Sequence, residues 1–67
     1  MEPNFSLKIG QDVQVRGHDD RLTWAQVIGL DGYWVTVKWL TPRIGQDGWL
    51  VANTGETHRT RLVNIVA

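Results

Sequence analysis

Apolar and polar residues alternate with a period of two along several short segments, and no segment repeats its apolar residues at helical spacing. In residues 12–16, Val13 and Val15 point to one side and polar residues to the other, which is the pattern of a half-buried strand. The same alternation runs through residues 33–40, where β-branched and aromatic residues occupy every second position. These segments predict an all-β fold.

Residues 22–30 are also rich in β-formers but lack a clean polar face. Trp24 and Ile28 fall on one side, and Ala25 and Val27 on the other. This pattern predicts either a central strand that is covered on both sides or a bulge that changes the phase of the side chains.

Turn residues separate these strands. Asp31-Gly32 tolerates the positive φ angles of a type I′ turn, so it predicts a hairpin between the second and third strands. Pro42 and Gly45 predict a loop over residues 41–47. A short apolar strand at 49–51, a turn at 53–55, a strand at 56–61 and a final strand, alone or after one helical turn, at 62–66 complete the chain.

Short strands at this spacing predict a five-stranded SH3-like (Tudor-like) barrel, formed by residues 1–67 as a single domain with a loose N-terminus at 1–6. A chain of 67 residues buries only a small core. The expected core residues are Val13, Val15, Val27, Ile28, Val35, Val37, Leu62 and Ile65.

Composition narrows the possible chemistry. The chain has no cysteine, which favours a reducing, cytoplasmic location and excludes thiolate metal sites. Two histidines are too few for a zinc site built from protein ligands alone. We find no signal peptide and no apolar run long enough for a membrane span. We therefore expect no metal, no cofactor and no membrane partner.

The charges cancel, with seven basic and seven acidic residues. An overall positive charge, the usual mark of a phosphate-backbone binder, is therefore absent. The second half of the chain is nevertheless mildly basic, because it carries Lys38, Arg43, Arg59 and Arg61. We interpret these four residues as a candidate interface for an anionic partner or as an ordinary solvated surface.

Tryptophan is unusually frequent, with four in 67 residues. So small a core does not easily hold four indoles, and tryptophan is rarely buried completely. Trp34 shares a face with Thr36 and Lys38, so it is our best candidate for an exposed or interfacial indole.

Catalytic groups are scarce. His18, Asp19 and Asp20 form a polar loop that would suit acid–base work, but a solvated loop is the simpler interpretation. Length and class resemble the plasmid-type dihydrofolate reductase, a tetramer of small barrels. Its Val-Gln-Ile-Tyr motif is absent, and Val13-Gln14-Val15-Arg16 is only a superficial parallel. We expect a non-catalytic protein.

Two segments combine an aromatic residue with small or β-branched ones: Thr23-Trp24-Ala25-Gln26-Val27-Ile28 and Val35-Thr36-Val37-Lys38-Trp39. They resemble strands of Tudor domains, in which aromatic rings form a cage for methylated ammonium or guanidinium groups. The resemblance implies Trp24 and Trp39 as cage walls, with Trp49 closing the pocket. His18 stands near the place of the missing first-loop aromatic, and Asp19 or Asp20 would supply the negative charge.

A second resemblance rests on residues 7–16, on Asp19-Asp20-Arg21, on residues 25–28 and 35–39, and on Gly55-Glu56-Thr57. Through these segments, most of the chain is similar to the N-terminal Tudor-like domain of kinesin-13 motors. It implies a cytoplasmic adaptor module that helps to localise a microtubule motor. Lys38 replaces the family's usual acid, and residues 41–52 have no counterpart in it.

Three functions follow from these observations. The first is a protein- or peptide-binding module that acts through Trp24, Trp39 and Trp49 on a methylated or an unmodified ligand. The second is a nucleic-acid-binding barrel that uses Lys38, Arg43, Arg59 and Arg61 with stacking aromatics. The third is self-assembly into a homo-oligomer through an exposed Trp34 or Trp49.

Overall fold

The computed structural model describes residues 7–17 and 20–66, and strands dominate this part of the chain. The predicted loose N-terminus at residues 1–6 lies outside the described residues. The strands are β1 (Asp12–Arg16), β2 (Leu22–Asp31), β3 (Trp34–Trp39), β4 (Arg43–Ile44), β5 (Leu50–Ala52), β6 (Thr57–Arg61) and β7 (Ile65–Val66), and one 3₁₀ turn, η1 (Leu62–Asn64), precedes the last strand. The all-β class is confirmed.

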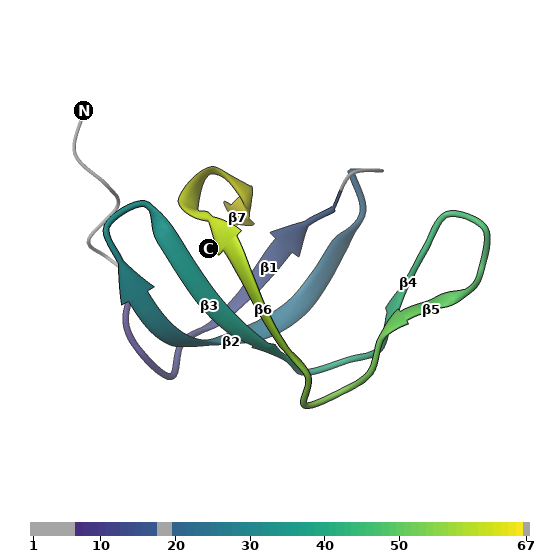
Figure 1. Ribbon diagram of the computed structural model, residues 1–67, viewed down its shortest axis with the longest axis horizontal. Coiled ribbons are helices and arrows are strands. Elements are labelled where there is room, and N and C mark those ends of the chain that lie inside the picture. Colours follow the sequence, from purple (N-terminus) through teal and green to yellow (C-terminus); the bar gives the residue numbers. More distant parts are fainter. Residues whose placement is uncertain (1–6, 18–19, 67) are drawn as a thin grey trace.

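Five strands form one antiparallel sheet in the order β6-β3-β2-β1-β7. Its two edge strands, β6 and β7, are joined through η1, so the sheet curls back on itself (Figure 1). Within the described residues these edges do not pair with each other, so hydrogen bonding leaves the sheet open. The curled sheet presents a concave inner face, which holds the core.

The hairpin between β2 and β3 turns one residue later than predicted. Asp31 pairs with Trp34, so the two loop residues are Gly32 and Tyr33. Gly32 has a φ of +60° and Tyr33 a negative φ, which are the signs of a type II′ turn rather than of a type I′ turn at Asp31-Gly32. A shift of one residue would turn every side chain to the other face, so burial of the valines fixes the register.

A β-bulge interrupts the pairing of β2 with β3 between Val27 and Gly29. Of the two alternatives for this strand, the bulge is the one found. Ile28 is 39% exposed, so the prediction that it is a core residue is wrong. Ile28 directly follows the buried Val27, so the alternation along β2 places it on the outer face of the sheet.

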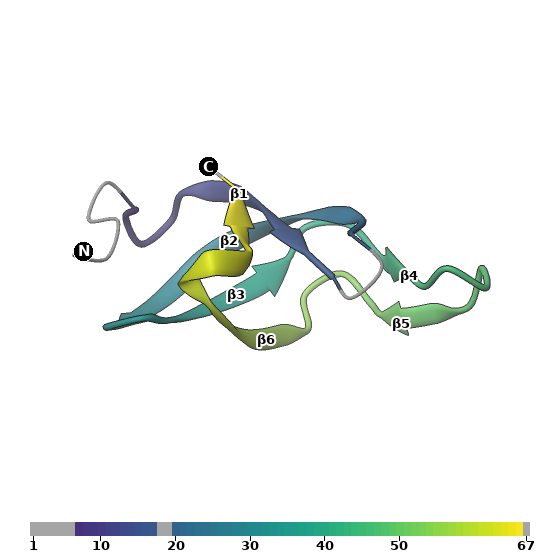
Figure 2. The same cartoon turned by 90° about the horizontal axis from the view of Figure 1, so that it is seen from above.

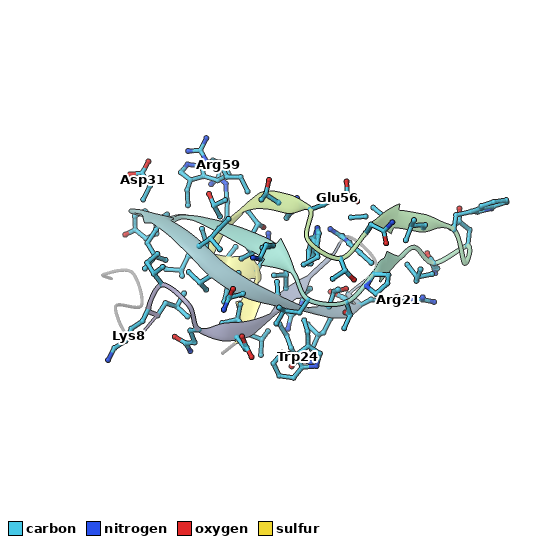
Figure 3. All side chains as sticks on the ribbon, turned by 90° about the horizontal axis from the view of Figure 1, so that it is seen from below. Lys8, Arg21, Trp24, Asp31, Glu56 and Arg59 are labelled. Carbon is cyan, nitrogen blue, oxygen red and sulfur yellow. The ribbon has the colours of Figure 1, made fainter. Side chains whose placement is uncertain are left out.

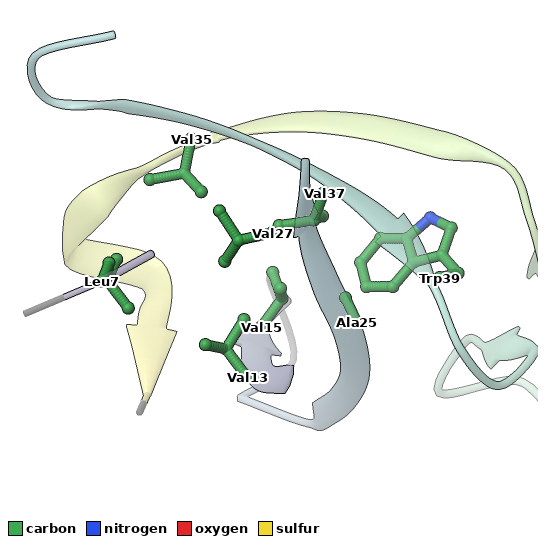
Figure 4. Close-up of a cluster of buried hydrophobic side chains, with 8 residues drawn as sticks. All are labelled: Leu7, Val13, Val15, Ala25, Val27, Val35, Val37 and Trp39. Carbon is green, nitrogen blue, oxygen red and sulfur yellow. The ribbon is translucent and has the colours of Figure 1, made fainter. Parts of the chain in front are cut away.

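The core contains the buried residues Leu7, Val13, Val15, Ala25, Val27, Val35, Val37 and Trp39 (Figure 4). All five predicted valines are buried, as the alternation indicated. Leu62 and Ile65 are only partly buried and pack against this cluster. Trp39 lies at one end of the cluster and Leu7 at the other, so they close its two ends (Figure 4).

A second, two-stranded sheet pairs β4 with β5. This hairpin projects from the body of the molecule (Figures 1 and 2). The prediction that residues 41–47 are a loop throughout is wrong, because β4 falls within them. Strands of two and three residues are too short to show a periodic pattern.

Candidate functional site

The four tryptophans occupy four different environments. Trp39 is 2% exposed, Trp34 37%, Trp24 48% and Trp49 75%. Trp39 is further covered by His58, whose ring stacks on it at 5.3 Å between centroids, and by the guanidinium of Arg43, 5.4 Å from its ring centroid. The ring of Trp39 therefore serves as core and does not face an open pocket.

The residues of the predicted aromatic cage are not brought together. Trp24 projects from β2 on the side of the molecule opposite to Arg59 (Figure 3). Trp49 lies beside the tip of the β4–β5 hairpin. Asp20 has a side chain that is 90% exposed and forms a weak ion pair with Arg16 at 4.0 Å. His18 and Asp19 lie outside the described residues.

The structure instead brings basic residues together in an open groove along β6, with a volume of about 520 Å³. We call it the β6 groove; its lining residues are Arg16, Gly17, Trp34, Arg43, Val51, His58, Arg59, Thr60, Arg61 and Asn64. Four of these ten residues are arginines, and none is acidic. Arg43, Arg59 and Arg61 of the predicted interface for an anionic partner therefore meet here. Lys38, the fourth residue of that prediction, does not line the groove.

The alternation along β6 explains which side chains face where. Opposite residues of an antiparallel pair share a face, and Arg61 pairs with Trp34 and Arg59 with Thr36. The two arginines therefore lie on the outer face of the sheet beside Trp34. His58 pairs with the buried Val37, so it lies on the inner face and reaches the groove from that side.

The wall of the groove opposite β6 is formed by η1 and the end of β1, which the pairing of β7 with β1 brings together. The side-chain amide of Asn64 in η1 donates a hydrogen bond of 3.0 Å to the Thr60 hydroxyl, and this bond ties η1 to β6. Arg16 and Gly17 at the end of β1 complete the lining.

Two guanidinium groups share one indole in this groove. The guanidinium carbon of Arg59 lies 4.4 Å from the centroid of the Trp34 ring, and that of Arg61 lies 5.1 Å from it. Each contact contributes about 0.5–1 kcal/mol at an exposed site. Neither arginine forms an ion pair within the described residues. The indole thus holds two like charges side by side.

None of the acidic residues of the described part lines the groove, but two lie next to lining residues: Asp20 pairs with Arg16 at 4.0 Å, and Asp31 is the cross-strand partner of Trp34. Asp47 accepts a hydrogen bond from the backbone N–H of Trp49, and Glu56 accepts one from that of Asn53, so both carboxylates stabilise turns. The zero net charge of the chain therefore hides an uneven distribution, with positive charge collected along β6.

The position of His58 in the groove changes the pKa of its imidazole. Burial lowers the pKa of His58 below its ordinary value of 6.5, and the positive charge of Arg43 lowers it further. The imidazole is therefore neutral in the folded protein near pH 7.

We expect the stability of the protein to fall as the pH is lowered below about 6.5. Between pH 6.5 and the lower pKa of folded His58, the unfolded chain binds more protons than the folded one, so protonation favours unfolding. Urea midpoints measured from pH 7.5 to 5 should decrease, and the decrease should be smaller in His58→Gln, which cannot titrate. An equal decrease in the variant would show that His58 is not its cause.

Arg16, His58 and Asn64 line the groove but were not among the predicted site residues. A signal existed for His58, since the alternation in residues 56–61 already places it opposite Arg59 and Arg61. Arg16 and Asn64 reach the groove only through the pairing of β1 with β7, which no local pattern reveals.

Within the described residues there is no cluster of three or more side chains suited to hold a metal ion. The same part of the chain contains no helix that is long and apolar enough to cross a membrane. Comparison with known proteins gives no family model, no curated relative and no solved structure that matches this chain.

Proposed function

We propose that this chain is a non-catalytic, cytoplasmic binding module that takes a single-stranded nucleic acid in the β6 groove. One observation carries the proposal: four arginines and His58 line one groove that has no acidic residue. The absence of cysteine supports the location in a reducing compartment.

A phosphate backbone fits the charge of this groove. Guanidinium groups bind phosphate oxygens in a bidentate manner and form charge-assisted hydrogen bonds with them. Arg59 and Arg61 are held next to each other on Trp34 with no carboxylate partner in the described residues. A phosphate placed between them would relieve their mutual repulsion.

Unpaired bases fit the remaining chemistry. Guanidinium planes and indoles provide surfaces on which bases of any sequence can stack. Trp34 remains 37% exposed beside its two arginines, so part of its ring is open to a ligand. Reading a DNA duplex requires a helix or a polar ribbon for the major groove. The only helical element described is η1 with three residues, and the β4–β5 ribbon is mostly apolar at its exposed positions.

We further propose that the fold is an SH3-like barrel whose seam forms the groove. The strand order supports this assignment, since β1, β2, β3 and β6 follow one another as a meander and β7 returns to β1 after one 3₁₀ turn. The Tudor-like cage has weaker support, because Trp39 is buried and Trp24 lies on another side of the molecule.

Fluorescence anisotropy with a labelled fifteen-nucleotide oligo-dT and the matching oligo-U tests the proposal. We expect the logarithm of the association constant to decrease linearly with the logarithm of the salt concentration. Three to four phosphate contacts in a single strand give a slope of about −2 to −3, which is a loss of roughly 20- to 50-fold in affinity between 50 and 200 mM salt.

Poly-glutamate of the same length is the competitor that distinguishes a nucleic acid from an acidic peptide. Under the proposal it displaces the oligonucleotide only at a large excess, because it offers charge without bases to stack. Displacement at equal concentration would assign the groove to acidic peptides. Absence of oligonucleotide binding at 50 mM salt would end the proposal.

A further inference from the structure

A second indole of the β6 groove also has two basic side chains against it. The ring of His58 stacks on the ring of Trp39, with 5.3 Å between the centroids and 26° between the planes. The guanidinium carbon of Arg43 lies 5.4 Å from the centroid of the same indole. Trp39 itself is buried, but His58 and Arg43 both line the groove. The arrangement repeats that of the two arginines on Trp34, except that one of the two groups here can lose its charge.

The imidazole of His58 is available to a ligand. The side chain is only partly buried, and within the described residues neither of its ring nitrogens takes part in a hydrogen bond. A protonated imidazole donates from both nitrogens, whereas a neutral one donates from a single nitrogen. Protonation therefore adds both a charge and a donor to this part of the groove.

The charged groups that surround His58 are mostly positive. β4 contributes Arg43, the end of β1 contributes Arg16, and β6 itself contributes Arg59 and Arg61. The residues that β3, β5 and η1 place around it are uncharged: Val37, Trp39, Val51 and Asn64. Glu56, two positions earlier in the chain, accepts a hydrogen bond from the backbone N–H of Asn53, and Asp20 pairs with Arg16. An anion for His58 must therefore come from a ligand.

We propose that His58 takes up a proton when the groove binds a nucleic acid, and that the imidazolium and Arg43 then hold one phosphate together beside Trp39. This inference rests on the proposed function of the groove. In the free protein near pH 7, burial and the charge of Arg43 keep the imidazole neutral. A phosphate next to both groups offsets the repulsion from Arg43 and favours the charged imidazole. The face of an indole attracts a cation, so the stack on Trp39 suits the imidazolium as well.

The groove then has one phosphate position that is charged at every pH, at Trp34, and one that depends on the pH, at Trp39. Because binding and protonation favour each other, the affinity for a single strand rises as the pH falls. The rise begins near the pKa of His58 in the complex and ends below its lower pKa in the free protein. Each unit between these two pKa values corresponds to at most about a tenfold change in affinity.

Anisotropy titrations of the whole chain with oligo-dT at pH 7.5, 6.5 and 5.5 test the inference at constant salt, since neither thymine nor a phosphodiester titrates in this range. We expect the affinity to rise roughly 3- to 10-fold toward pH 5.5. The salt slope should become steeper by about 0.7, the contribution of one further phosphate contact. Circular dichroism at each pH gives the folded fraction, to which the affinities are referred.

Two variants separate His58 from the other histidine of the chain. His58→Gln cannot titrate, so its affinity and salt slope should be the same at all three pH values. His18→Gln is the matched control, because it removes the other histidine and should keep both changes. A pH dependence that persists in His58→Gln, or that disappears in His18→Gln, would overturn the inference.

Proton NMR of the histidine rings in the original protein gives an independent readout, with the two variants used to assign the signals. The pKa of His58 should be higher in the complex with oligo-dT than in the free protein. Binding that is independent of pH, with an unchanged pKa of His58, would overturn this inference and leave the proposed function in place. Absence of binding at all three pH values would instead end the proposed function, and this inference with it.

Discussion

Replacing Trp39 with alanine is expected to remove about 3–5 kcal/mol from the free energy of unfolding. The side chain is 2% exposed and closes one end of the core, where His58 stacks on it and Arg43 covers it. A domain of this size has a total stability of about 3–10 kcal/mol, so Trp39→Ala should be largely unfolded or close to it. Urea denaturation followed by circular dichroism measures the loss.

Trp49→Ala is the control for this change, because it removes the same side chain from a position that is 75% exposed. Its free energy of unfolding should stay within about 0.5 kcal/mol of the original. If Trp39→Ala unfolds at the same urea concentration as Trp49→Ala, then the indole of Trp39 is not part of the core.

The contrast between these two residues shows what the sequence reveals about the fold. Trp39 continues the alternation of Val35 and Val37, so its burial follows from period-two patterning alone. Trp49 stands beside a strand of three residues, which is too short for a pattern. Long alternating strands were therefore predictable, and the β4–β5 hairpin was not.

The β2–β3 hairpin shows the limit of turn signals. Asp31-Gly32 indicated a hairpin, but a glycine with positive φ fits the second position of a type I′ turn and the first position of a type II′ turn equally well. The register of Val35 and Val37 against β2 decides between them, and that pairing depends on the whole sheet.

The candidate site was predictable in part. The basic character of the second half of the chain pointed to Arg43, Arg59 and Arg61, and the alternation placed the last two on one face. Their association with Arg16 depends on the pairing of β7 with β1, which joins residues far apart in the sequence. The cage was inferred from Trp24 on β2 and Trp39 on β3. Trp39 lies opposite Ala25, the neighbour of Trp24, so the two indoles lie on opposite faces of the sheet.

The arginines of β6 have two consequences that belong together. They give the β6 groove its positive charge, and they also keep the free edge of β6 from pairing with another copy of itself. The same two side chains thus serve an anionic ligand and protect an edge of the sheet.

Replacing both Arg59 and Arg61 with glutamine is expected to weaken oligonucleotide binding roughly 10- to 100-fold at low salt, because each loses charge-assisted hydrogen bonds to phosphate. The salt slope should become shallower by about 1.4, since each phosphate contact in a single strand contributes about 0.7. Both side chains are exposed, so the urea midpoint should change little. Anisotropy titrations at four salt concentrations measure affinity and slope together.

Lys8→Gln removes one positive charge from a position that does not line the groove, and Lys8 and Arg59 point to opposite sides of the molecule (Figure 3). Its affinity and salt slope should match those of the original protein. An equal loss of binding free energy per removed charge in Lys8→Gln and in the double variant would mean that the oligonucleotide responds to net charge alone. A slope that stays the same in the double variant would place the phosphate contacts outside β6, because the salt slope counts contacts and is insensitive to a purely structural change.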